Sequence, residues 1–346
     1  MIRAEAHGRV NLMGEHTDYN LGLVLPTPIP QRTVVQLEPR ADDTIRIRAR
    51  GFGEVSYRLG AEKPAHDWSD YAKACTATLQ SSGVGLRGFD AEVTSDVPVG
   101  AGVSSSAAFL VALLRAIRDA FALQFDDTTL ALLAQRAEVE FVGARVGIMD
   151  QLAASRGHLG EALLIDTADL SVDRVELPLS IALVVIDSGV RHAHAGGGYN
   201  TRRAECEEAA RALGLPSLRN VRDFDALERL PPLLARRVRH VVSENERVQE
   251  AAAALSGGDV GRLGQLFDAS HASQRDDFDV SIPEVDALAT ALRHAGALGA
   301  RLTGGGFGGS VVAVAALGTE REVAKAARLA YERQSGRKAS VILPPP

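Results

Sequence analysis

Residues 97–123 read VPVGAGVSSSAAFLVALLRAIRDAFAL, and this stretch carries the strongest fold signal of the chain. Small residues fill its first half, whereas apolar residues recur at helical spacing from Phe109 to Leu123. Glycines let backbone amides approach an anion, and the first turn of a helix presents unpaired N–H groups at the positive end of its dipole. The stretch predicts a glycine loop that opens a helix and is suited to phosphate. The alternative is a serine run that only caps the helix.

This loop differs from the two best-known glycine loops that bind nucleotides. No Gly-Lys-Ser/Thr follows the glycines, so it is not a Walker A loop. Ser105 stands where the third glycine of a protein-kinase loop belongs. If the loop binds a nucleotide, the chain therefore belongs to another class of nucleotide-binding protein.

The segments on either side of the loop predict a mixed sheet with helices. Residues 32–38, 44–49 and 89–94 alternate or carry β-branched side chains, which indicates strands. A helix is expected at 127–142, and the apolar segment ALLIDT at 162–167 follows it. We expect these elements to form one domain.

The second half of the chain begins with a predicted strand at 180–189 and is then mainly helical. Helical patterns lie near 201–213, 232–255, 259–273 and 283–296, and a strand-helix-strand pattern runs from Ser310 to Leu343. Because 346 residues exceed one ordinary core, we expect an α+β chain of two domains, 1–170 and 171–346.

Composition excludes several classes of protein. A net charge of −6 provides no basic field for nucleic acid. The local cluster of Arg236, Arg237 and Arg239 is typical of a solvated helix face. Only Cys75 and Cys206 occur, which favours a reducing, cytoplasmic compartment. Neither a signal peptide nor a membrane span is predicted.

The segment GRVNLMGEHTDYN at residues 8–20 is unusually polar. A buried segment of this kind needs polar partners, and a sugar requires such a mixture because every hydroxyl group both donates and accepts. The alternative is a solvated turn, for which residues 17–20 have suitable composition.

One acid, Asp150, stands in the apolar stretch GIMDQ at residues 147–151. Its charge needs compensation, and Arg9 is the candidate partner. A carboxylate paired with arginine stays ionised and can accept a hydroxyl proton. A helix cap or a structural ion pair remains an alternative.

The glycine cluster at 304–309 matches Gly-x-Gly-x-x-Gly, the pattern of dinucleotide-binding proteins. The segment after it, SVVAVAAL, indicates a strand instead of a helix, and only residues 310–346 remain. We therefore interpret these glycines as a place where the backbone packs closely against a ligand or a loop.

Together, GRVNLMGEHTDYN, DVPVGAGVSSSAA and RLTGGGFGGS resemble the three signature segments of the GHMP small-molecule kinases. The first resembles the signature of the galactokinases, and agreement extends through GIMDQ and residues 271–286. This resemblance covers nearly the whole chain. It implies the two-domain GHMP architecture, with a mixed-sheet N-terminal domain, an α+β C-terminal domain and an active site in the cleft between them.

The resemblance also implies roles for individual residues. Asp150 would be the catalytic base or charge stabiliser, and Arg9 would lie beside the anomeric oxygen and the γ-phosphate. Mg²⁺ would lie between Ser105 and Glu138, although Glu138 is also typical of ordinary surface charge, and Trp68 would lie near the adenine of ATP unless it is simply core. The sugar would contact Glu15, His16, Asp18, the backbone of Gly147 and Tyr199, and the nucleotide phosphates would contact Gly100, Gly102, Ser104, Ser105 and Ser106.

Two departures from the family pattern stand out. Ser310 stands where members of the family often have cysteine. The stretch RHAHAGGGYN around Tyr199 is richer in glycine and histidine than the usual serine-bearing version, so the contacts in that part of the sugar pocket are not predicted. His192 and His194 are interpreted as loop residues, because no third metal ligand can be assigned to them from the sequence.

The implied activity is ATP-dependent phosphorylation of galactose at its anomeric hydroxyl, with the small sugar and ATP as partners and a monomer or weak homodimer as the assembly. A sibling 1-kinase for N-acetylgalactosamine, arabinose or a uronic acid is the alternative. A sugar-sensing regulator is a further alternative, but such members are altered in the serine loop, which is complete here.

Overall fold

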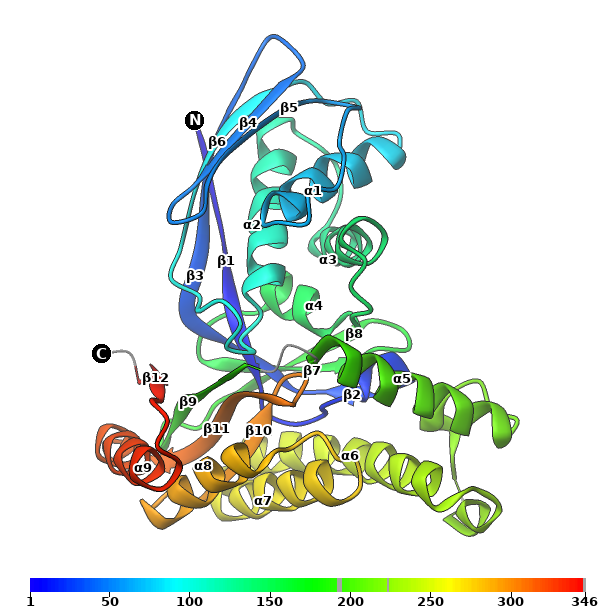
Figure 1. Cartoon of the computed structure of the whole chain (residues 1–346), viewed down its shortest axis with the longest axis vertical. Coiled ribbons are helices and arrows are strands. Elements are labelled where there is room, and N and C mark those ends of the chain that lie inside the picture. Colours follow the sequence, from blue (N-terminus) through cyan, green and yellow to red (C-terminus); the bar gives the residue numbers. More distant parts are fainter. Residues whose placement is uncertain (192–194, 223, 345–346) are drawn as a thin grey trace. The chain divides into compact units, whose positions relative to one another are not determined.

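The computed structural model describes residues 1–191, 195–222 and 224–344 (Figure 1). The chain divides into two compact units, each made of separate segments. The first unit comprises Met1–Arg9, Pro28–Val99 and Ser104–Leu159, and the second comprises Val10–Thr27, Gly100–Val103 and Gly160–Pro346. A single boundary near residue 170 is expected from the sequence, whereas these units interleave along the chain.

The first unit is built on a five-stranded sheet. Its strands run in the order β1 (Ile2–Asn11), β3 (Pro26–Pro39), β6 (Phe89–Ser95), β4 (Thr44–Ala49) and β5 (Gly53–Arg58). The β4–β6 pair is parallel, and β3–β6 and β4–β5 are antiparallel. In β4, Ile45 and Ile47 are buried while Arg46 and Arg48 are exposed, because alternate side chains of a strand point to opposite faces.

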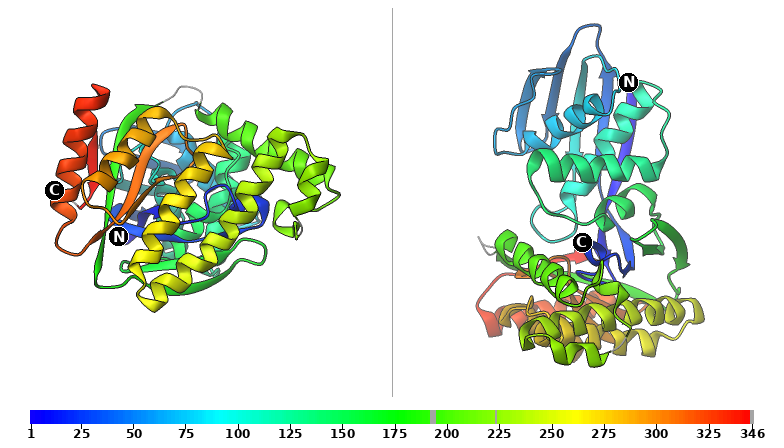
Figure 2. Two further views of the ribbon diagram at one scale, coloured as in Figure 1. Left: turned by 90° about the horizontal axis from the view of Figure 1, so that it is seen from below. Right: turned by 90° about the vertical axis from the view of Figure 1, so that its right-hand side faces the viewer.

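Helices cover one face of this sheet (Figures 1 and 2). They are α1 (Ser69–Ser81), α2 (Ser105–Ala120), α3 (Asp127–Arg136) and α4 (Met149–Arg156), with a π-helical turn at Ala137–Val142. Leu110, Leu114 and Ile117 of α2 recur at helical spacing and are fully buried in the core of the unit. The core thus fixes the direction of α2 and of the glycine loop before it.

The second unit contains two antiparallel sheets. The larger has the order β10 (Gly299–Thr303), β11 (Gly308–Ala316), β9 (Ile181–Arg191) and β12 (Ser340–Leu343), and the smaller has the order β2 (Leu23–Val24), β7 (Glu161–Asp166) and β8 (Ser171–Glu176). The helices are α5 (Ala195–Ala212), α6 (Pro232–Gly257), α7 (Val260–Asp276), α8 (Pro283–His294) and α9 (Glu320–Ser335), with 3-10 turns at Asp18–Asn20, Leu218–Asn220 and Phe224–Arg229.

Helices α8 and α9 pack on the larger sheet of this unit, α8 against β10 and β11 and α9 against β9. Helix α7 packs against β10 and α6 (Figure 2). Strand β10 therefore lies under two helices, and all of its residues are buried. This is the setting of Arg301, a charged residue in the middle of a fully buried edge strand.

Most predicted elements are confirmed, and the differences have local causes. Helix α2 already begins at Ser105, before the apolar repeat that starts at Phe109, because Ser105 and Ser106 form its first turn. The predicted helix 127–142 is α-helical only to Arg136 and continues as the π-helical turn. The strand that we expected after the glycine cluster is β11.

The expectation of a fully solvated arginine face on α6 is wrong for one residue. Arg236 and Arg239 are exposed, but Arg237 is buried. Its Nε donates to Glu205 at 2.6 Å and its Nη1 to the Asp277 carbonyl at 2.6 Å, so its charge and donors are satisfied inside the unit. His192 and His194 lie outside the described residues.

The described part of the chain contains no helix with both the length and the apolar character needed to span a bilayer.

Candidate functional site

Asp150 and Arg9 form a bidentate ion pair in the first unit. Arg9 Nε donates to Asp150 Oδ1 at 2.8 Å, and Arg9 Nη2 donates to Oδ2 at 2.8 Å. Ser104 Oγ also donates to Oδ2, at 2.5 Å. The guanidinium is buried, whereas the Asp150 side chain is 29% exposed. The carboxylate is therefore held in one orientation with an accessible edge, and the predicted pairing with Arg9 is present.

Glu138 projects from the π-helical turn into the interior of the same unit. Burial raises its pKa to about 7, and the nearby charge of Asp150 adds to this effect, while hydrogen bonds from Ser106 and Gln151 oppose it. Gln151 Nε2 donates to Glu138 Oε2 at 2.8 Å. Two carboxylates near each other favour a cation, and oxygen donors of this kind suit Mg²⁺.

Ser105 and Ser106 lie side by side in the first turn of α2. Ser106 is the residue that contacts Glu138, whereas Ser105 lines a cavity together with Ser106. Within the described residues, no three His, Cys, Asp or Glu side chains gather as a metal site. The donors present therefore fit an ion that takes few protein ligands and completes its shell with phosphate and water.

Trp68 lines that same cavity, which has a volume of about 150 Å³. Phe52, Tyr71 and Phe109 form further aromatic parts of its wall, and the ring centroids of Phe52 and Trp68 are 6.4 Å apart. Flat aromatic walls of this kind suit a planar heteroaromatic ring. Because Ser105 and Ser106 also line the cavity, it reaches the start of α2.

The glycine loop before α2 is held by unusual backbone conformations. Gly100 and Gly102 have φ values of +73° and +76°, and Ser104, a residue with a Cβ, also has a left-handed φ of 62°. A Cβ at Gly100 would come within 3.0 Å of Arg191 Nε in the second unit, to which Gly100 belongs. At Gly100 the loop thus requires the positive φ, and a side chain there would also have to displace the Arg191 side chain.

Glu15 and His16 lie in the second unit and are engaged by the glycine cluster after β10. The Glu15 carboxylate accepts from Gly304 N at 3.0 Å and from Arg301. Burial and the neighbouring His240 lower the pKa of His16 to about 3, so its imidazole is neutral. Its Nε2 is 3.2 Å from the Gly305 carbonyl oxygen, which can only accept, so Nε2 carries the proton and donates. Nδ1 is then unprotonated and accepts from the Tyr19 hydroxyl at 2.8 Å. Both ring nitrogens of His16 are therefore used within the protein.

The remaining residues predicted to contact the sugar are found in two places. Tyr199 lies in the second unit, and the centroid of its ring is 5.1 Å from that of the His16 ring and 5.6 Å from that of the Tyr19 ring. Asp18 is half-buried at the start of its 3-10 turn and accepts from Tyr19 N at 2.9 Å. Gly147 belongs to the first unit, in the loop that leads into α4 and Asp150.

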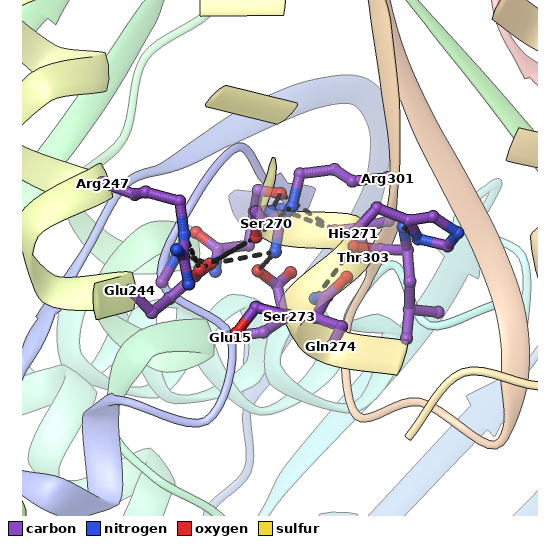
Figure 3. Close-up of polar contacts among 12 residues, drawn as sticks. Glu15, Glu244, Arg247, Ser270, His271, Ser273, Gln274, Arg301 and Thr303 are labelled. Carbon is purple, nitrogen blue, oxygen red and sulfur yellow. Dashed lines mark hydrogen bonds and ion pairs between the residues drawn. The ribbon is translucent and has the colours of Figure 1, made fainter. Parts of the chain in front are cut away.

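Sequence reasoning missed two charged residues of the second unit: Arg301, which contacts the predicted site residue Glu15, and Glu244, which contacts Arg301 (Figure 3). Arg301 and Glu244 are both fully buried and are close to each other and to Glu15. The sequence could have indicated Arg301, because a charged residue in a short apolar strand needs buried partners. Glu244 had no such signal, since an acid in the polar pattern of α6 is typical of a solvated face.

Comparison with known proteins places this geometry in a family. Residues 2–39 match the profile described as galactokinase galactose-binding signature, residues 70–158 match GHMP kinases N terminal domain, and residues 249–335 match GHMP kinases C terminal. The structure of Lactococcus lactis galactokinase complexed with galactose is 33% identical with a TM-score of 0.93, and the match covers 98% of this chain and 92% of that one. The chain belongs to the galactokinase family of GHMP kinases.

More distant members of the superfamily share only the fold. Methanococcus jannaschii mevalonate kinase is 16% identical with a TM-score of 0.72, over 99% of this chain and 96% of that one. Streptococcus pneumoniae phosphomevalonate kinase in complex with phosphomevalonate and AMPPNP is 15% identical with a TM-score of 0.70, over 99% and 100%. The expected α+β, two-domain GHMP architecture is thus confirmed.

Proposed function

We propose that this member of the galactokinase family transfers the γ-phosphoryl group of ATP to the anomeric hydroxyl of galactose, giving galactose 1-phosphate and ADP. The observation that carries the proposal is the Arg9–Asp150 pair, whose accessible carboxylate is fixed by two guanidinium bonds and by Ser104. The match to the galactose-binding signature over residues 2–39 supports galactose as the acceptor.

Asp150 and Arg9 are assigned to the chemical step. The Asp150 carboxylate takes the proton of the anomeric hydroxyl while that oxygen bonds to the γ-phosphorus and the bond to the bridging oxygen of ADP breaks. The Arg9 guanidinium keeps the carboxylate oriented and adds positive charge beside the transferring group. Positioning and electrostatics supply most of the catalysis in phosphoryl transfer, so a rigid pair is the appropriate device.

We assign the nucleotide to the glycine loop and the aromatic cavity. Gly100, Gly102, Ser104, Ser105 and Ser106 would contact its phosphates through backbone amides and hydroxyls at the N-terminus of α2. Trp68 would contact the adenine ring, which the size and aromatic walls of the cavity support.

We assign Mg²⁺ to Ser105 and Glu138, with Glu138 as its carboxylate ligand. When bound, the ion would neutralise charge on the phosphates of ATP. The buried position of Glu138 supports this assignment, since a cation compensates a carboxylate that burial otherwise drives toward its neutral form.

We assign the sugar to Glu15, Asp18, Tyr199 and the backbone of Gly147. The half-buried Asp18 carboxylate and the Tyr199 ring supply an acceptor and an apolar surface, a combination that suits a sugar. The engagement of both His16 ring nitrogens supports a different role for that side chain, which is to hold Tyr19 and the 304–309 loop in place.

A panel of sugars tests the proposed function. ADP release should be measured with ATP, Mg²⁺ and, in turn, galactose, N-acetylgalactosamine, arabinose, galacturonic acid and glucose. Galactose should give the highest kcat/KM, the phosphate should appear at the anomeric carbon, and EDTA should abolish turnover. Faster turnover of another sugar would assign a sibling 1-kinase, and sugar binding without turnover of any sugar would favour a sensor.

A further inference from the structure

Arg301 occupies a position where a charged side chain has no access to water. It is the third residue of β10 and has no exposed surface. Its Nε donates to Ser270 Oγ at 3.1 Å and its Nη1 to the Asn11 carbonyl at 3.1 Å. Its Nη2 donates to the Glu15 carboxylate and is 3.4 Å from Glu244 Oε1 (Figure 3). The guanidinium therefore contacts three separate segments of the second unit, which are residues 11–15, helix α6 and helix α7.

Glu244 completes the charge balance around Arg301. Burial opposes its ionisation, but Arg247 and Arg301 hold the pKa of Glu244 well below its usual range. Its carboxylate accepts from Arg247 Nε at 2.7 Å, from Ser270 Oγ at 2.7 and 2.9 Å, and from Gly14 N at 3.0 Å. Arg247 and Ser270 thus share Glu244 with Arg301, whose Nη2 also donates to Glu15.

This network fixes both ends of the segment that leads to Glu15. Arg301 contacts the Asn11 carbonyl at its start, Glu244 contacts Gly14 N near its end, and Glu15 itself reaches Gly304 N. The carboxylate of Glu15 is thus held between the guanidinium and the first amide of the 304–309 loop. A planar fork with five donors can serve these acceptors together, whereas a lysine has one nitrogen.

We propose that Arg301 is a positioning residue for sugar binding, which acts through Glu15 and is itself anchored by Glu244 and Ser270. This inference rests on the proposed function, in which Glu15 contacts the sugar. Arg301 sets the orientation of the Glu15 carboxylate and so determines the KM for galactose without contributing to nucleotide binding.

The test compares Arg301→Lys with wild type in steady-state kinetics. The KM for galactose should rise about tenfold or more, because charge-assisted contacts to Glu15 are lost, while the KM for ATP stays within about twofold. Arg237→Lys is the matched control, since Arg237 is equally buried in the same unit but bonds to Glu205 and the Asp277 carbonyl. Its two KM values should remain near those of wild type.

A double-mutant cycle separates positioning from general destabilisation. If Arg301 acts through Glu15, Arg301→Lys should add little to the galactose KM of Glu15→Gln. Ser270→Ala is a milder variant that loosens Arg301 without removing its charge, and it should raise the galactose KM several-fold if Arg301→Lys does not fold. The inference is overturned if the Arg301 and Glu15 effects multiply, if both KM values rise together, or if Ser270→Ala leaves the galactose KM unchanged.

Failure of the proposed function gives a different result. In that case wild type itself does not phosphorylate galactose, and the sugar that the panel identifies replaces galactose in the same comparison of variants.

Discussion

At the scale of single residues, Asp150 shows how a surface-accessible acid is kept in one orientation. Two guanidinium bonds and one hydroxyl bond hold its two oxygens, although Arg9 is 141 positions away in the chain. Such convergence restricts the carboxylate more than a surface ion pair would, since exposed pairs contribute about 1 kcal/mol or less. A fixed acceptor is what proton transfer from a bound hydroxyl requires.

Replacing Asp150 by Asn should therefore remove the base while keeping the shape of the side chain. We expect kcat to fall by about 10²- to 10⁴-fold and the dissociation constant for galactose to change only a few-fold. Turnover and calorimetric titration measure the two effects. Glu140→Gln, which neutralises an exposed acid on the nearby π-helical turn, should leave both unchanged. An Asp150→Asn enzyme with more than a tenth of wild-type turnover would remove Asp150 from the mechanism.

At the scale of elements, the hairpin between β10 and β11 depends on a close approach of backbones. Gly306 has a φ of +83°, and a Cβ there would lie 2.7 Å from both the Cβ and the carbonyl oxygen of Val280. Phe307 N donates to that same carbonyl at 2.7 Å, so the loop cannot move away without losing a hydrogen bond. The glycine cluster is thus a packing requirement, as the sequence analysis predicts, and it supports Gly304 and Gly305 in their contacts with Glu15 and His16.

Gly306→Ala and Gly318→Ala form a matched pair that isolates this contact. Both glycines have positive φ, but a Cβ at Gly318 meets nothing within 4 Å. Gly318→Ala should cost about 1 kcal/mol from backbone strain alone, whereas Gly306→Ala should cost about 2 kcal/mol more because it also overpacks Val280. Thermal unfolding measures the difference. Equal shifts in Tm for the two variants would contradict the packing explanation.

The π-helical turn at Ala137–Val142 explains the position of Glu138. A continuous α-helix over residues 127–142 is the natural prediction from local pattern, yet the helix widens to a π-turn at Ala137. Such turns are frequently found at functional sites. The turn carries a buried Glu138 and an exposed Glu140, so one acid of the pair is in the interior and the other is in solvent.

At the scale of the whole molecule, burial shifts the pKa values of four described groups, Glu15, Glu138, His16 and His240, and so makes stability depend on pH. Burial raises the pKa of Glu15 and Glu138 to about 7, and their contribution to stability is lost as pH rises from about 4.5 to 7. Burial lowers the pKa of His16 to about 3 and of His240 to about 4, and their contribution is lost as pH falls below about 6.5. Between pH 4.5 and 6.5 a rise in pH lowers the free energy of unfolding through the two glutamates and raises it through the two histidines, so the two effects nearly cancel.

The free energy of unfolding of the ligand-free wild type should therefore be almost constant from about pH 5 to 6.5. Glu138→Gln removes one of the two declining contributions, so its free energy of unfolding should rise with pH in this window, by about 1 kcal/mol per pH unit. Chemical denaturation at several pH values measures both slopes. Parallel curves for the two proteins would show that Glu138 titrates normally.

Local sequence determined many of the elements and indicated the family. The glycine-serine loop that opens α2, the alternating strands β4 and β6 and the strand after the glycine cluster were all predicted, because each depends on residues within one or two turns. The signature at residues 8–20 indicated the family, since it preserves residue types in order along the chain.

For Arg237, Glu244 and Arg301, only the tertiary structure decided that the charge is buried and what satisfies it. Arg237 and Glu244 are interior on a helix whose pattern reads as polar, and Arg301 joins Glu15 across 286 positions. The interleaved units have the same origin, because residues 10–27 and 100–103 join the second unit through contacts distant in sequence. Periodicity encodes which face of an element is apolar, whereas the partner of a buried charge depends on long-range packing that no local pattern contains.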